Sequence, residues 1–149
     1  MAVVAWLMVL LPQFSTGPTE DMAALELQMV ALINLEREAR GIPPLERKRE
    51  LTAIARSYSR RMAATGKVNH EMDRPAEERI KDALPNSCVF GENVSKHTNI
   101  EYSIGDMMAS QGHRENLLDT RFEALGVGIV RGDDFLYFTL EFARLCEVR

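Results

Sequence analysis

A chain of 149 residues is long enough to bury one hydrophobic core and too short for two ordinary domains, so we predict a single domain. Hydrophobic residues make up 46% of it and charged residues 27%, close to the average globular protein, which excludes a disordered chain or a repeat array. The net charge of −4 gives no basic surface, which argues against nucleic-acid binding.

The N-terminal segment Ala2–Leu11 is an apolar run that ends at Pro12. It is too short to span a bilayer as a helix, so we do not expect an integral membrane protein. Its length is typical of a signal-peptide core, and Ser15–Gly17 supplies small residues for cleavage. We therefore expect a leader over residues 1–18, a domain over residues 19–149, and secretion or residence in the cell envelope. The alternative is a buried N-terminal segment.

Two cysteines, Cys88 and Cys146, are the only ones in the chain. In an exported protein they would form one disulfide bond. The alternative is two buried thiols that act as small hydrophobic groups.

Two long helices are predicted in the first half of the chain. The first starts at Thr19 or Glu20 and ends before Gly41, and its apolar stripe comprises Leu25, Met29, Leu32 and Ile33. Its charged residues lie mostly off this stripe and are expected to face solvent; they are Glu26, Glu36, Arg37, Glu38 and Arg40. The second helix runs from about Arg49 to Thr65, with Gly66 as its cap.

Shorter elements follow. A helix over residues 76–84 leaves His70 in a polar loop, and Cys88–Val94 is predicted to be a short extended segment that ends in a turn around Glu92. A helix over residues 100–109 precedes a further helical turn over residues 113–118. The chain closes with a hairpin whose second strand is Phe135–Phe142. Its alternation puts one set of side chains on one face and the other set on the opposite face; the first set is Phe135, Tyr137, Thr139 and Glu141, and the second is Leu136, Phe138, Leu140 and Phe142. Helices covering its apolar face make the fold class α+β.

Several motifs, taken in this order and spacing, resemble the CAP superfamily (SCP domain) of cysteine-rich secretory proteins, antigen 5 and pathogenesis-related 1 proteins, in its bacterial short form. They are Leu32–Arg37, Gly41–Leu45, Leu51–Arg56, His70, Gly91–Val94, Gly112–Leu118 and Leu125–Gly128. The resemblance implies an α-β-α sandwich with a small antiparallel sheet, export from the cell, and a central cavity.

The cavity of this family is lined by two histidines and, in many members, by two acids. By position, His70, Glu92 and His113 match both histidines and one acid. In plant and animal relatives the second acid lies in the helix before the Gly-His motif. Here no acid falls on that place, and Asp106 is only a neighbour of it.

Two imidazoles and a carboxylate are also a ligand set for Zn²⁺ or another divalent metal, with water in the fourth position. A metal-dependent hydrolase would use His70 and His113 as ligands with Glu92, which would also serve as the catalytic base. The alternative is a hydrogen-bonded polar cluster that has no catalytic role. In it Asn93, Arg114 and Asn116 act as structural supports.

The function usually ascribed to the family is binding of sterols, lipids or protein partners. We therefore expect a non-enzymatic binding module, whose polar His/Glu cavity takes a small apolar ligand, a divalent metal or a partner surface. The protease-like hydrolase remains the alternative.

Overall fold

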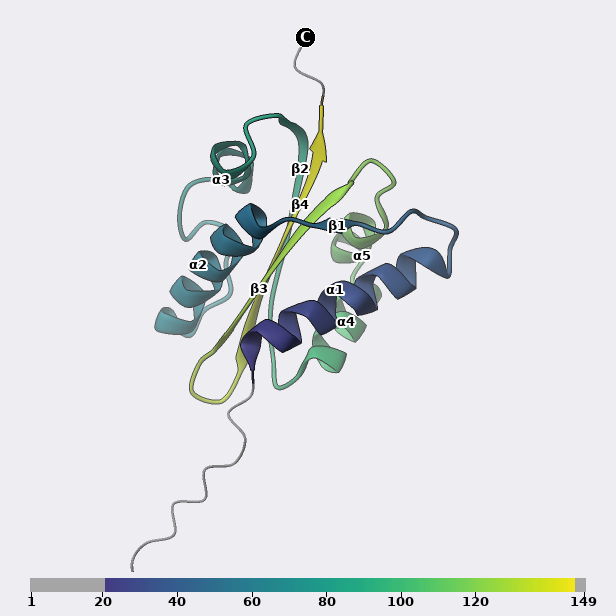
Figure 1. Cartoon of the computed structure of the whole chain (residues 1–149). Helices are drawn as coiled ribbons and strands as arrows, with labels where there is room; N and C mark the ends of the chain where they lie inside the picture. The colour runs from purple at the N-terminus through teal and green to yellow at the C-terminus, as the bar shows by residue number, and fades with distance from the viewer. Residues whose placement is uncertain (1–20, 147–149) are drawn as a thin grey trace, which may run out of the picture.

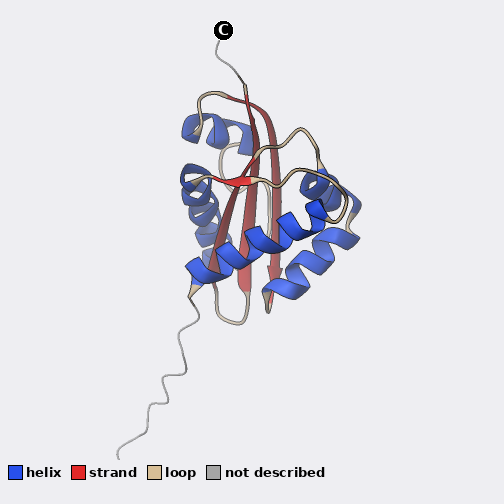
Figure 2. Ribbon diagram, turned by 45° about the vertical axis from the view of Figure 1, so that its right-hand side comes forward, coloured by secondary structure: helices blue, strands red, loops and turns tan. Residues whose placement is uncertain are grey.

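The computed structural model describes residues 21–146, so the predicted leader over residues 1–18 lies outside the described residues. Within this range five helices and four strands form three layers, with helices on both faces of one sheet (Figures 1 and 2). The predicted α+β class and α-β-α sandwich are confirmed. No helix in the described range is long and apolar enough to cross a membrane.

The sheet has the strand order β1-β3-β4-β2. The predicted hairpin is present as β3 (Ala124–Arg131) and β4 (Leu136–Leu145), and β1 (Glu46–Arg47), which was not predicted, adds a short parallel edge. On the other side of β4 lies the antiparallel strand β2 (Ser87–His97).

The predicted turn around Glu92 is wrong. Strand β2 continues through this point, and Glu92 pairs with Glu141 in the middle of the β2–β4 ladder. The physical reason is that β4 offers a continuous partner strand, so the backbone of Gly91 and Asn93 stays extended and hydrogen-bonded. Glu92 is thus carried by the sheet and not by a loop.

One face of the sheet is covered by α1 (Met22–Glu38), α4 (Ile100–Ala109) and α5 (Gln111–Leu118) (Figure 2). The main hydrophobic core lies here and includes the alternate residues of β4 that were predicted to share a face, namely Leu136, Phe138, Leu140 and Phe142. They pack with α1 and α4 side chains such as Met29, Ile33 and Met107.

The other face is covered by α2 (Arg49–Thr65) and α3 (Ala76–Ala83), which lie beside each other in Figure 1. The core on this side is smaller and contains polar groups. The hydroxyl of Ser59 on α2 is 2.8 Å from that of Thr139 on β4 and 2.9 Å from the carbonyl oxygen of Gly128. Glu141 points into the same layer and is fully buried.

Two residues of the expected solvent-facing charged surface of α1 are instead buried. Glu26 receives hydrogen bonds from Arg56 and from the backbone N–H of Ile129. Arg37 donates to the carbonyl oxygens of Leu117 and Asp119, each at 3.0 Å. Because these partners satisfy both charged groups, α1 can pack them inward, and the prediction of exposure was wrong for these two.

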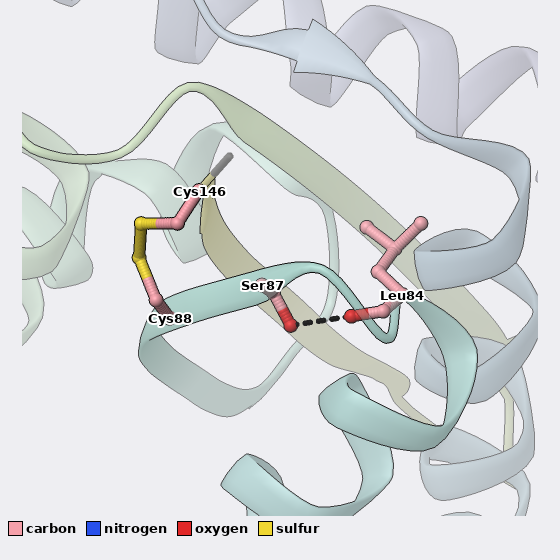
Figure 3. The surroundings of a disulfide bond; sticks show 4 residues. All are labelled: Leu84, Ser87, Cys88 and Cys146. Carbon is pink, nitrogen blue, oxygen red and sulfur yellow. Dashed lines mark hydrogen bonds between the residues drawn. A yellow bond between two sulfur atoms is a disulfide. The ribbon is translucent and has the colours of Figure 1, made fainter. Parts of the chain in front are cut away.

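The disulfide Cys88–Cys146 is present and joins the beginning of β2 to the residue after β4 (Figure 3). The two Cα atoms are 5.9 Å apart, and the bond closes a loop between residues separated by 58 positions. A loop of this length corresponds to roughly 4 kcal/mol of stabilisation in the chain-entropy model. Beside it, the Ser87 hydroxyl donates to the carbonyl oxygen of Leu84 and fixes the entry into β2 (Figure 3).

Helix α2 lies directly on β3 because two glycines leave room for its backbone. A Cβ atom added to Gly126 would lie 2.2 Å from the carbonyl carbon of Leu51, and one added to Gly128 would lie 2.2 Å from that of Ala55. Backbone atoms cannot move aside as a flexible side chain can, so these positions set the distance between the helix and the sheet.

We predict that Gly128→Ala destabilises the protein by about 3 kcal/mol or more, because the new methyl group must push α2 away from the sheet. Urea unfolding measures the change. Gly105→Ala is the matched control: its added Cβ meets nothing within 4 Å, and alanine in helix α4 should stabilise by about 0.5–1 kcal/mol. Equal effects of the two substitutions would contradict the close packing.

Candidate functional site

His70 and Glu92, which the sequence predicted to meet, are in direct contact. The His70 ring nitrogen Nδ1 is 2.7 Å from Oε1 of Glu92. His70 lies in the loop between α2 and α3 and its side chain is 54% exposed, whereas the Glu92 side chain on β2 is only 5% exposed. The Glu92 hydrogen bond raises the pKa of His70 above its usual 6.5. The pair therefore has a buried carboxylate and an accessible imidazole.

Arg79, which the sequence analysis did not select, is the centre of the site. It lies on α3, is almost completely buried, and donates through Nη2 to Oε2 of Glu92 and through Nη1 to Oε1 of Glu141 at 2.6 Å. Its guanidinium group stacks over the ring of Tyr58 with 4.0 Å between Cζ and the ring centroid. The guanidinium group of Arg79 thus forms hydrogen bonds with two carboxyl groups and a cation–π contact with one aromatic ring.

Glu141 is a second acid at the site, contributed by β4 and not by the helix before His113. It is fully buried, stands opposite Glu92 in the ladder, and its Oε2 has no hydrogen-bond partner in the described part of the chain. Burial first, and then the charge of Glu92, raise the pKa of Glu141 to about 8. The raised pKa favours the protonated form of Glu141, next to the Arg79–Glu92 ion pair.

His113 lies on α5, near the other two residues but not bonded to them. Burial first, and then the positive charge of His70, lower its pKa below 6.5. Within residues 21–146 its ring makes no hydrogen bond, whereas its carbonyl oxygen accepts one from the amide of Asn93 at 3.0 Å. The site therefore has two imidazoles of opposite tendency, since the pKa of His113 is lowered and that of His70 is raised.

The three predicted support residues hold α5 in place. The Asn116 amide donates to the carbonyl oxygen of Glu92 at 3.2 Å and to Oδ1 of Asn93 at 2.9 Å, so α5 is tied to β2. Arg114 donates to the carbonyl oxygen of Met108 at 3.0 Å and links α5 to the end of α4. The position of His113 thus depends on amide contacts with the strand that carries Glu92.

The predicted metal site requires His70, His113 and Glu92 to act together as ligands. Glu92 does not fit this task well, because its two oxygens already accept from His70 and Arg79. No group of three or more His, Cys, Asp or Glu side chains among the described residues is arranged to hold a metal ion. Asp106, the neighbour of the missing acid, lies 3.4 Å from His97 instead. Metal binding stays a prediction that this donor set does not favour.

An open groove of about 470 Å³ lies next to the buried network. It is lined by His70, Glu71, Asp73, Pro75, Ala76 and Glu92. Most of these residues are exposed, so the groove presents an imidazole and several carboxylates to whatever approaches it.

The family model "CAP: Cysteine-rich secretory protein family" matches residues 30–142, which contain His70, Arg79, Glu92, His113 and Glu141. The chain belongs to this family. Among curated CAP relatives, the uncharacterized protein YkwD of Bacillus subtilis is 29% identical over 119 residues, covering 78% of this chain and 46% of that protein. The chain thus spans about half the length of that relative.

Solved CAP structures show the same fold. An extracellular protein of Bacillus anthracis that contains an SCP domain has a TM-score of 0.75 at 24% identity, covering 83% of this chain and 41% of that one. An outer surface protein of Borrelia burgdorferi has a TM-score of 0.79 at 16% identity, covering 85% of this chain and 96% of that one. At these identities the likeness shows the fold alone.

We predict that Glu141 makes the protein less stable as the pH rises from about 4.5 to about 8. Its folded-state pKa lies above the usual 4.5, so its contribution is full below pH 4.5 and is lost as the pH passes 8. Each pKa unit corresponds to about 1.4 kcal/mol, so the loss amounts to a few kcal/mol. Urea unfolding at several pH values measures it.

Glu141→Gln keeps the shape of the neutral acid and should flatten this dependence. The exposed Glu101→Gln is the control and should leave it as in the wild type. Because the raised pKa of His70 acts in the same direction, the test is the difference between wild type and Glu141→Gln. Identical pH profiles for these two proteins would show that Glu141 is ionised.

We further predict that His70→Ala raises the pKa of His113 toward 6.5, because it removes one of the two causes of its lowering. A proton NMR titration of the ring hydrogens measures this directly. His97→Ala is the control, since His97 pairs with Asp106 and should not affect His113. An unchanged His113 pKa after removal of His70 would mean that the two imidazoles are not neighbours.

Proposed function

We propose that this CAP-domain protein is exported and binds a partner protein, without catalysis, through the surface formed by His70, His113 and the groove beside Glu92. The observation that carries the proposal is that both carboxylate oxygens of Glu92 accept hydrogen bonds from the protein. One of its oxygens accepts from the exposed His70 and the other from the buried Arg79. The carboxylate thus acts as a fixed anchor that orients an accessible imidazole.

The same contacts argue against the hydrolase alternative. A general base needs an oxygen or nitrogen atom within hydrogen-bond reach of the proton that it removes. Both oxygens of Glu92 are occupied by protein donors, and Glu141 lies fully buried beneath Arg79. The second ring nitrogen of His70 and the ring of His113 make no hydrogen bond within residues 21–146, and both suit hydrogen bonding to a bound partner.

The open, charged groove favours a protein over a sterol or lipid. Sites for small apolar ligands are concave and lined mainly by hydrophobic and aromatic side chains. Here the lining consists of His70, Glu71, Asp73, Pro75, Ala76 and Glu92, and it includes no Leu, Ile, Val, Met, Phe, Tyr or Trp side chain. A polar protein surface can match such a pattern of donors and acceptors.

Two observations support export. The disulfide Cys88–Cys146 is of the kind that persists in oxidising compartments outside the cytoplasm. Two of the solved relatives are described as an extracellular protein and an outer surface protein.

Peptides that bind the wild-type protein can be selected from a displayed random library. We predict that these peptides bind the double variant His70→Ala/His113→Ala at least about tenfold more weakly than the wild type. Truncation removes both imidazoles and leaves the ion pair of Glu92 with Arg79 in place. Isothermal titration calorimetry measures the affinity. His97→Ala, which removes the third histidine of the chain, should bind as the wild type does.

Three results would contradict the proposal. Selected peptides could bind equally well to the double variant, which would move the interface elsewhere. A sterol or fatty acid could raise the stability by about 2.7 kcal/mol at 100 times its dissociation constant, which would make it an apolar-ligand carrier. Hydrolysis of casein could be lost on His113→Ala, which would make the protein an enzyme.

A further inference from the structure

A second groove, of about 360 Å³, lies between α2 and α3, the neighbouring helices of one face of the sheet in Figure 1. One wall is a stripe of α2 residues spaced by three and four positions, namely Ile54, Ser57, Tyr58 and Arg61. Of the residues in the site above, only Asp73, Tyr58 and Arg79 touch this groove, and His70, Glu92 and His113 do not line it. It is therefore a separate space.

The rim of the groove is formed by two ion pairs. Arg61 on α2 is 3.2 Å from Asp73, and Arg74, the next residue in the loop, is 2.7 Å from Asp82 on α3. Both arginine side chains are about half exposed, at 50% and 53%. Ion pairs this exposed contribute little to stability, so a ligand carboxylate can replace the protein's own carboxylates at small cost.

The interior of the groove is less polar than its rim. Ile54 and Ala83 contribute half-buried aliphatic side chains from different helices, and the buried ring of Tyr58, on which Arg79 stacks, also lines the groove. The hydroxyl of Ser57 has no hydrogen-bond partner within residues 21–146, although it lines the groove. An apolar body with one anionic end matches this combination of an aliphatic floor and guanidinium groups at the entrance.

Two of the three arginines in the lining are available to an anion. Arg79 is already bonded to Glu92 and Glu141, whereas Arg61 and Arg74 are each paired with a single exposed aspartate at the rim. Arg61 and Arg74 each use only Nη1 in their ion pairs, which leaves further N–H groups of each planar fork for a second acceptor. A carboxylate is the group that such forks bind with two parallel hydrogen bonds.

We propose that the α2–α3 groove binds a small carboxylate with an apolar body, either a free acid or the C-terminal residue of a peptide. Arg61 and Arg74 hold the carboxylate, and Ile54, Tyr58 and Ala83 contact the body. This inference does not depend on the partner-binding function proposed above, because its contacts involve none of His70, Glu92 or His113.

The test is an NMR titration of the ¹⁵N-labelled chain with 3-phenylpropionate and, separately, with N-acetyl-glycyl-phenylalanine. Saturable shifts are expected in residues 54–61 and 73–83. The corresponding amides, which lack the carboxylate, should bind at least about tenfold more weakly. Tighter binding of the free acid would identify a small metabolite-like ligand, whereas tighter binding of the peptide would identify a C-terminus.

The variant Arg61→Gln/Arg74→Gln should bind both carboxylate ligands at least about tenfold more weakly, because it lacks the two charged guanidinium groups. Arg60→Gln is the matched control: it removes an exposed charge from the neighbouring α2 position, which lies outside the groove. Ala83→Leu fills the floor and should also weaken binding while leaving both arginines in place. The spectrum of each free variant reports whether it is folded.

The inference is overturned if neither acid gives saturable shifts, or if the shifts map outside the two segments. It is also overturned if the amides bind as well as the acids, or if Arg60→Gln weakens binding as much as the double variant does.

Discussion

The site depends on one buried guanidinium group. Glu92 and Glu141 stand opposite each other on adjacent strands, and like charges at such positions repel. Arg79 bonds to both carboxyl groups, and the raised pKa of Glu141 favours its protonated form, which reduces the repulsion. Removing Arg79 would take away the cation bonded to the fully buried Glu141 and leave Glu92 with His70 alone, which is far costlier than losing a surface charge.

Arg79 also controls the position of the exposed His70 by two routes. The first is direct, because Arg79 fixes the carboxylate to which His70 is bonded. The second passes through Tyr58, whose ring stacks on Arg79 and whose hydroxyl donates to the carbonyl oxygen of Asn69 and accepts from the backbone N–H of Met72. The loop on both sides of His70 is thus attached to the same buried tyrosine, so an exposed side chain is held by an interior network.

Structural features that depend on residues close together in the sequence were predicted correctly from local patterns. The apolar spacing of α2, the glycine at its end and the alternation of β4 all follow from a few adjacent positions. Burial of Arg37 could not be predicted in this way, because the acceptors of its Nη1 group lie 80 and 82 positions further along the chain. Glu141 was placed on the correct face of its strand, but only the tertiary packing of α3 brings Arg79 to it.

The glycines of β3 explain why such a polar cluster can be buried on this face. Gly126, Glu141 and Glu92 form one row across three strands, since Gly126 pairs with Glu141 and Glu141 with Glu92. Without a side chain at Gly126, α2 rests on the backbone of β3, which brings Tyr58 down beside the neighbouring strands. The ring and the guanidinium of Arg79 then cover Glu141 and exclude water from it. The raised pKa of Glu141 therefore depends on the short distance between α2 and the sheet. The glycines of β3 thus contribute to the site, although they touch none of the polar atoms of its side chains.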